Sequence, residues 1–306
     1  MSDLSERHLF PDIGPQCRNE VGIKTVKGEH EGLAPRTLSS YIPSMSLPPD
    51  RLNRFARHIV LPEIGGAGQV ALSKAHVFMI GCGGIGSPAL QYLAAAGVGR
   101  FTLIDDDTVE ESNLQRQTIF REMDIGSAKV EAATRWLANF DPAIAVETRT
   151  TRITTANAEP IIAGATLVLD GSDNFATRLA VSDACVAAGV PLTSAAIGRF
   201  QGQIVNLAGH LPEHACYRCF VGDAFDAEDC DTCAADGVLG AFVGMVGTFA
   251  AMSAIRVILN NAGGGTGIAG PLADPQWGQL HVLYGLTPSL RPVTIARDPA
   301  CASHAI

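Results

Sequence analysis

The sequence predicts an α/β fold in which a mainly parallel, Rossmann-like sheet carries helices on both faces. Short apolar stretches alternate with Ala- and Leu-rich stretches of helical spacing through the middle of the chain. A glycine-rich turn, "GCGGIG", directly follows the first apolar stretch and precedes a helical one. Strands that alternate with helices form a parallel sheet covered on both faces, and such a turn is typical of nucleotide-binding members of that class.

The composition suits a cytoplasmic protein with a sizeable core. The 306 residues are 47% hydrophobic, and a formal net charge of −9 argues against nucleic acid or an anionic membrane surface as the main partner. By sequence, no apolar run reaches the roughly 18 residues that span a bilayer, and the N-terminus lacks the features of a secretory signal. In the cytoplasm the eight cysteines are expected to be free, metal-bound or catalytic rather than disulfide-bonded.

Residues 1–48 are polar, show no hydrophobic period and end in "SYIPSMSLPPD". We predict that they form a mostly disordered extension, followed by one folded domain over residues 49–306. The domain is expected to open with a helix in "RLNRFARHIVLPEIG", which has helical spacing.

The remaining elements are predicted from hydrophobic periodicity and from the turn residues that separate the segments. The predicted strands are "HVFMI", "RFTLIDDD", "AVETRTT", "ATLVLDGSD", "VPLTSAAI" and "FQGQIVNLA". Helices are expected after the glycine turn, in "SAKVEAATRWLANF" and in "NFATRLAVSDACVAAG". Next come "CYRCF", an acidic stretch and the apolar helix "GMVGTFAAMSAIRVIL". The glycine-rich "NNAGGGTGIAGP" is expected to be a flexible linker, and a last strand, "QLHVLYGL", precedes the tail.

The glycine turn predicts a phosphate-binding site. Gly81, Gly83 and Gly86 match G-x-G-x-x-G between a strand and a helix, where glycines permit close backbone approach and the helix N-terminus offers free N–H donors. Asp105, at the end of the second strand, stands where a carboxylate binds ribose hydroxyls. An NAD dehydrogenase would carry the same residues, so the turn predicts a nucleotide without naming it.

Charged residues beyond the turn favour nucleotidyl or phosphoryl transfer. Such transfer requires cations near the phosphates, whereas hydride transfer does not require them. A carboxylate at the end of a strand suits Mg²⁺. Taken singly, Arg116 and Lys129 have the alternative of being surface charges, and Asp173 has the alternative of capping a helix. The residues concerned are Asn113, Arg116 and Gln117 in "NLQRQ", Lys129 at the start of the next helix, and Asp170 and Asp173 in "DGSDN".

Cysteine spacing predicts half of a zinc site in "CYRC", at Cys216 and Cys219. The spacing leaves two completions open. One is a nearby second C-x-x-C, formed by Cys230 and Cys233; the other is the terminal "CASH", with Cys301 and His304.

From Leu52 to His304 the chain resembles the ThiF/MoeB/HesA family, bacterial relatives of ubiquitin-activating enzymes. The resemblance is carried by "RFARHIVL", "GCGGIGS", "AGVG", "LIDDDTVEESNLQRQ", "GSAKVEAA", "DGSDN", "GQI", "CYRC" and "ADGVLG". It implies that the protein uses ATP to adenylate the C-terminal glycine carboxylate of a small ubiquitin-like sulfur carrier (ThiS- or MoaD-like, ending in Gly-Gly). Pyrophosphate is released, and the pathway would be thiamine, molybdopterin or related sulfur transfer.

The resemblance also implies roles for individual residues. Asp105 would hold the ribose, and Asp173 would bind Mg²⁺. Arg57, before the glycine turn, matches a family arginine that reaches the active site of the other subunit, which implies a homodimer. The residues implied at the ATP phosphates are Gly81, Gly83, Gly86, Asn113, Arg116 and Lys129, and Gly84 and Gln117 are also implied to bind the nucleotide.

Family members that bind structural zinc use a second C-x-x-C near the C-terminus, after a lead that "ARDPACASH" matches. The resemblance therefore favours Zn²⁺ on Cys216, Cys219, Cys301 and His304, clamping a C-terminal appendage. Cys233 aligns with a family cysteine implicated in covalent linkage to the carrier, although its acidic surroundings would raise its pKa and oppose reactivity. Cys230 departs from the family pattern beside it.

Two further functions compete with the adenylyltransferase. One is the tRNA-modifying, ATP-dependent dehydratase branch of the superfamily, which typically lacks the paired zinc motifs and for which this acidic chain shows no basic RNA-binding stretch. The other is a non-catalytic adaptor for a ubiquitin-like protein, against which the retention of Arg116, Lys129 and Asp173 speaks. Because no rhodanese-like domain follows, the sulfur donor is expected to be a separate protein.

Overall fold

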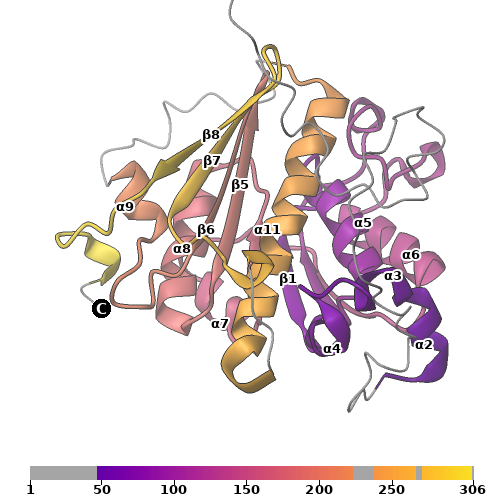
Figure 1. Cartoon of the computed structure of the whole chain (residues 1–306). Coiled ribbons are helices and arrows are strands. Elements are labelled where there is room, and N and C mark those ends of the chain that lie inside the picture. The colour runs from indigo at the N-terminus through magenta and orange to yellow at the C-terminus, as the bar shows by residue number, and fades with distance from the viewer. Residues whose placement is uncertain (1–46, 223–236, 267–270, 305–306) are drawn as a thin grey trace, which may run out of the picture. The chain divides into compact units, whose positions relative to one another are not determined.

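The computed structural model describes residues 47–222, 237–266 and 271–304, and within them eight strands form one mixed sheet in the order β3-β2-β1-β4-β5-β6-β7-β8 (Figure 1). The first five in that order run parallel, whereas β6, β7 and β8 are antiparallel to their neighbours. The strands are β1 (His76–Ile80), β2 (Arg100–Ile104), β3 (Ala145–Arg149), β4 (Leu167–Asp170), β5 (Leu192–Gly198), β6 (Gln201–Leu207), β7 (Gln279–Tyr284) and β8 (Ser289–Thr294).

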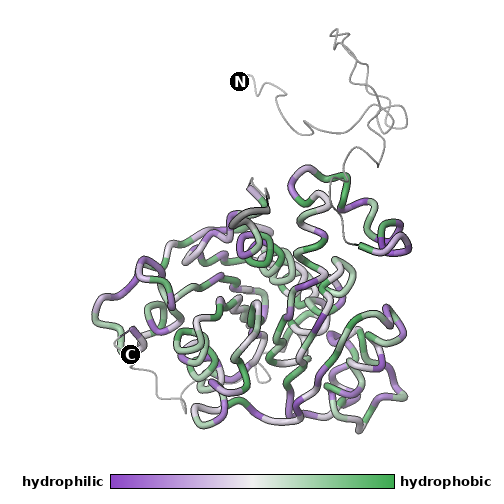
Figure 2. Tube along the Cα trace, turned by 90° about the horizontal axis from the view of Figure 1, so that it is seen from below, coloured by the Kyte–Doolittle hydropathy of each residue, from purple (hydrophilic) through white to green (hydrophobic). Residues whose placement is uncertain are grey.

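Alternate residues of β1 pack into two separate cores, one on each face of the sheet. Val77 and Met79 belong to a core with the first group of helices, and Phe78 and Ile80 to a core with the second. The first group is α4 (Gly65–Lys74), α5 (Gly86–Ala96), α6 (Lys129–Phe140) and α11 (Gly240–Thr266); the second is α7 (Ala158–Ile162), α8 (Phe175–Ala188) and α9 (Tyr217–Val221). Hydrophobic segments gather in the middle of the trace and hydrophilic ones at its outer turns (Figure 2). The predicted α/β class, a sheet flanked by helices, is confirmed.

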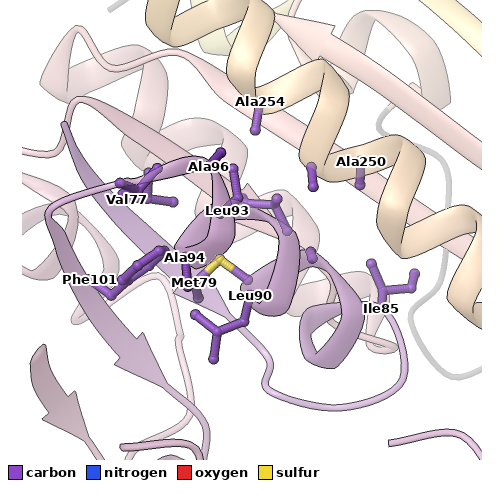
Figure 3. Packing of buried hydrophobic residues seen from close by; sticks show 14 of the residues in the cluster. Val77, Met79, Ile85, Leu90, Leu93, Ala94, Ala96, Phe101, Ala250 and Ala254 are labelled. Atoms are coloured by element: carbon purple, nitrogen blue, oxygen red, sulfur yellow. The ribbon is translucent and has the colours of Figure 1, made fainter. Parts of the chain in front are cut away.

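Small residues allow α11 to lie close against α5. Ala250 and Ala254 face the α5 side chains that include Leu93 (Figure 3). At Gly247 an added Cβ would lie 2.4 Å from the Pro88 ring, so only glycine permits this approach.

α11 corrects two sequence predictions: that no apolar run is long enough to span a bilayer, and that "NNAGGGTGIAGP" is a flexible linker from its first residue. By length and composition its Gly240–Ala262 stretch could cross a membrane, but 61% of its most apolar window is buried, as in the core helix of a soluble protein. The helix also continues to Thr266, through residues predicted to be a linker. Asn260 and Asn261 donate side-chain hydrogen bonds to the carbonyls of Ala273 (3.2 Å) and Thr166 (3.3 Å), so tertiary contacts outweigh the low helix propensity of the glycines.

Other differences are local. The predicted first helix is divided into α2 (Pro49–Arg54) and α3 (Ala56–Ile59), and α4 follows. β8 was not predicted and pairs with β7 at the sheet edge. Short 3-10 turns complete the described chain: η2 (Glu111–Asn113), η3 (Glu122–Asp124), η4 (Pro271–Ala273) and η5 (Ala302–His304). All these elements lie in one unit of the chain, Leu38–Ile306.

Candidate functional site

A cavity of about 530 Å³ opens at the carboxyl ends of β1, β2 and β4. Here the strand order reverses, because β2 pairs with one side of β1 and β4 with the other, and ligands of open α/β sheets bind at such a point. The volume lies in the usual range for small-molecule sites. The structure brings together around it most of the residues predicted from sequence: Gly81, Gly83, Gly84, Asp105, Asn113, Arg116, Gln117, Lys129 and Asp173.

The glycine turn forms one wall of the cavity. Gly81 has φ +85°, and a Cβ there would lie 3.3 Å from the backbone of Gly171, in the loop after β4. Gly86 does not line the cavity; a Cβ on it would stand 2.0 Å from the Gly81 carbonyl oxygen. Gly86 is therefore needed to close the turn onto the first residues of α5.

Asp105 fastens the end of β2 to the glycine turn. Its Oδ2 accepts the backbone N–H of Cys82 at 2.7 Å, and its Oδ1 accepts that of Asp107 at 2.9 Å. Burial raises the pKa of Asp105, and Lys129 and the two N–H donors oppose that rise. Sequence reasoning did not predict this structural bond. Ribose binding by Asp105 stays a prediction, since each oxygen retains a second lone pair.

Lys129 is the first residue of α6, and its side chain is only 8% exposed. Its Nζ donates to Asp107 Oδ2 at 2.7 Å, so the surface-charge alternative is wrong for this lysine. Arg116 is half-buried and donates from Nη1 to the Ser112 carbonyl at 2.9 Å. Gln117 is buried, and its Oε1 has no hydrogen-bond partner among the described residues.

Asp173 is exposed at the cavity, in the loop between β4 and α8. The capping alternative is wrong for it, because the neighbouring Asn174 caps α8 and accepts the N–H of Thr177 at 3.0 Å. Asp170 at the end of β4 is fully buried, and its Oδ1 accepts the Ser172 N–H at 2.9 Å. Burial raises the pKa of Asp170, and the charge of Arg178 opposes that rise.

Two arginines in the cavity wall were missed by the sequence reading. Arg178 on α8 is 7% exposed and donates from Nη2 to the Ser172 carbonyl. Arg152, after β3, pairs with Asp106 at 3.1 Å. The signal for Arg178 was an arginine in the first turn of the helix that follows "DGSDN". The sequence carried no such signal for Arg152.

The roles predicted for Arg57, Cys230 and Cys233 stay predictions. Arg57 is exposed on α3 and does not line the cavity, so its role toward a second subunit stays a prediction. Cys230 and Cys233 lie outside the described residues, and so does the compact zinc alternative that they would form.

A second cluster joins the "CYRC" segment to the tail. Cys216 precedes α9, while Cys301 precedes η5 and His304 is its last residue. Cys216 Sγ lies 3.8 Å from Cys219 Sγ and 3.6 Å from Cys301 Sγ, and His304 Nε2 lies 3.9 Å from Cys219 Sγ. A tetrahedral ion with Zn–S bonds near 2.3 Å separates its sulfurs by about 3.8 Å, so the donors fit Zn²⁺.

Protein contacts hold both halves of this cluster in place. Arg297 Nη1 donates to the carbonyls of Leu211 (3.1 Å) and His214 (2.9 Å), and the Asp298 N–H donates to Cys219 Sγ at 3.4 Å. Burial, together with the neighbouring sulfurs, raises the pKa of the Cys216 thiol to about 12. A bound cation would reverse that trend, because metal ligation deprotonates a thiol.

Comparisons with known proteins agree with this geometry. The ThiF family model matches residues 55–302. The SAMP-activating enzyme E1 of Haloferax volcanii is 40% identical over 217 residues, which are 71% of this chain and 79% of that protein. The sulfur carrier protein adenylyltransferase of Thermus thermophilus is 39% identical over 257 residues, 82% of this chain and 90% of that protein. The adenylyltransferase and sulfurtransferase MOCS3 of Sus scrofa is 41% identical over 276 residues, 90% of this chain but only 57% of that protein.

Among solved structures, E. coli MccB with ATP has a TM-score of 0.69 and 22% identity, covering 82% of this chain and 74% of that one. At this identity the likeness concerns the fold alone. It matches the sheet and helix arrangement described above.

Proposed function

The chain belongs to the ThiF family, and from this premise we propose that it is an ATP-dependent adenylyltransferase for a small ubiquitin-like sulfur-carrier protein. The observation that carries the proposal is the cavity at the strand switch point, where the glycine turn faces Arg116, Lys129 and Asp173. Phosphates need backbone donors and cations of this kind, and nucleotidyl transfer needs them most at the leaving pyrophosphate.

The reaction needs no side-chain nucleophile. An oxygen of the carrier's C-terminal glycine carboxylate attacks the α-phosphorus of ATP; a new P–O bond forms, the bond to the bridging oxygen breaks, and pyrophosphate leaves. Positioning and electrostatics supply the catalysis. Lys129 and Arg116 neutralise the developing charge, and Asp105 holds the ribose.

Asp173 is the residue proposed to hold Mg²⁺. Its carboxylate is exposed at the cavity and does not cap α8, which Asn174 caps. When bound, Mg²⁺ would neutralise phosphate charge and shape the substrate.

We extend the proposal to a structural Zn²⁺ on Cys216, Cys219, Cys301 and His304, supported by their spacing. The ion would tie the C-terminal segment to α9, so the terminal "CASH" would serve stability and not catalysis.

The remaining parts of the proposal rest on the sequence and on the family. Residues 49–306 would form the adenylation domain after an extension over residues 1–48. Arg57 would act in a partner subunit's site, and Cys233 would link covalently to the carrier. The burial of α11 supports a helix packed within the fold over one that crosses a membrane.

The test is Asp173→Ala. We expect it to abolish carrier-dependent ATP–pyrophosphate exchange while leaving the melting temperature unchanged, because the side chain is exposed. Asp50→Ala, an exposed aspartate at the start of α2, is the matched control and should retain exchange. Undiminished exchange in Asp173→Ala would refute its assignment. Candidate carriers ending in Gly-Gly, incubated with labelled ATP, would identify the partner by the acyl adenylate that forms.

A further inference from the structure

Arg178 is a buried cation in the cavity wall for which the proposed reaction has no use. Its side chain lines the cavity, yet the residue is only 7% exposed. Arginine is rarely buried to this extent, since taking a guanidinium out of water is costly unless it is well paired. Its partners therefore indicate why it is there.

The partners of Arg178 lie in the loop between β4 and α8. Arg178 Nη2 donates to the carbonyl of Ser172, while the N–H of Ser172 donates to Oδ1 of the buried Asp170 at 2.9 Å. The backbone of Ser172 is thus held at its carbonyl by a residue of α8 and at its N–H by a residue of β4.

This arrangement differs from a simple ion pair. Arg178 Nη1 and Asp170 Oδ2 are both buried without a hydrogen-bond partner among the described residues. A bidentate pair between the two side chains would satisfy both atoms. Instead the guanidinium uses a donor on the Ser172 carbonyl, which favours a role in holding the loop over a role in pairing charge.

The loop matters because Asp173 follows Ser172. The Asp173 side chain is exposed, so its direction depends on the backbone that carries it. The same loop touches the phosphate-binding turn: a Cβ on Gly81 would lie 3.4 Å from the Ser172 nitrogen. A shift of Ser172 would therefore change the position of the Asp173 carboxylate relative to the glycine turn.

We infer that Arg178 is a positioning residue for the magnesium–ATP site, where with Asp170 it fixes the Ser172 backbone and so aims the Asp173 carboxylate at the phosphates. The inference rests on the proposed function, in particular on Mg²⁺ binding by Asp173. Lysine is a poor replacement for Arg178 in this role, because its ammonium is a strongly hydrated point charge on a flexible chain that is one bond shorter than the path to Arg178 Nη2.

The test measures ATP binding to the full chain by calorimetry, without carrier, once with Mg²⁺ and once with EDTA. Arg178→Lys retains a positive charge beside Asp170 and should fold. We expect it to reduce the Mg²⁺-dependent gain in ATP affinity by about tenfold, the scale found for residues that orient metal ligands, while affinity in EDTA changes little. Arg135→Lys is the matched control. Arg135 lies on α6, outside the cavity, and pairs with Asp124 at 2.7 Å. Its substitution should leave the Mg²⁺-dependent gain unchanged.

A double-mutant cycle separates positioning from stability. Asp173→Ala should remove the Mg²⁺-dependent gain, and Arg178→Lys should have no further effect in that background, because it acts through Asp173. An unchanged gain in Arg178→Lys would overturn the inference, as would equal losses with Mg²⁺ and EDTA. A wild type without any Mg²⁺-dependent gain would overturn it together with the magnesium assignment. Absence of carrier-dependent exchange in a wild type that keeps the gain would refute the proposed carrier reaction and leave the role of Arg178 supported.

Discussion

Gly86→Ala tests whether the glycine turn is as tightly closed as the structure indicates. The added Cβ would stand 2.0 Å from the carbonyl oxygen of Gly81, whereas ordinary contacts begin near 3.4 Å. The two groups must therefore separate by about 1.4 Å. Both atoms belong to, or are rigidly attached to, the backbone, so no side-chain rotation relieves the overlap.

The surroundings oppose that separation. The Gly81 N–H is bonded to the Ile104 carbonyl at 2.9 Å, and the residue lies against Gly171. Overpacking of this kind costs about 3 kcal/mol, which corresponds to a fall in melting temperature of about 6 °C for a chain of this size. A displacement above 1 Å in the phosphate cradle is expected to slow pyrophosphate exchange about a hundredfold.

The assay combines thermal unfolding with carrier-dependent pyrophosphate exchange. Gly244→Ala is the matched control, because an added Cβ there meets nothing within 4 Å on α11. It should leave exchange unchanged and stabilise the protein by roughly 0.5–1 kcal/mol, as alanine does in helices. Wild-type melting temperature and exchange in Gly86→Ala would refute the reasoning.

Two further predictions concern contacts outside the cavity. Burial would raise the pKa of Asp141, but its bonds to Arg51 at 2.7 and 2.8 Å outweigh burial and lower it, so Asp141→Asn should cost about 2 kcal/mol in urea unfolding at pH 7. A carboxyl whose pKa is lowered in the folded state stabilises the protein at pH values above its unfolded-state pKa, near 3.9. The difference in unfolding free energy between wild type and Asp141→Asn should therefore shrink as the pH falls through and below that value. A constant difference would contradict the ion pair. Glu147→Gln, which breaks an exposed pair with Arg100, is the control and should change little. His304→Ala should lower the zinc retained per chain in metal analysis; equal, stoichiometric zinc in both proteins would remove His304 from the site.

Sequence reasoning located most of the cavity because its signals are local. Alternation of strands and helices predicts a parallel sheet, and the carboxyl ends of parallel strands meet at one edge. Residues that follow β1, β2 and β4, such as Gly81, Asp105 and Asp173, must therefore converge however the rest of the chain packs. The sequence by itself thus determined the class of the fold and the edge where the nucleotide would bind.

Only the tertiary structure decided what joins distant segments. It brought Cys216 Sγ within 3.6 Å of Cys301 Sγ, and it extended α11 through three glycines, where Asn261 bonds to the carbonyl of Thr166. These outcomes depend on packing between elements far apart in the chain, and the periodicity of a single segment carries no information about them. A helix or a strand can be read from its own residues, but the partner of a buried charge or thiol is determined by the elements that pack against it.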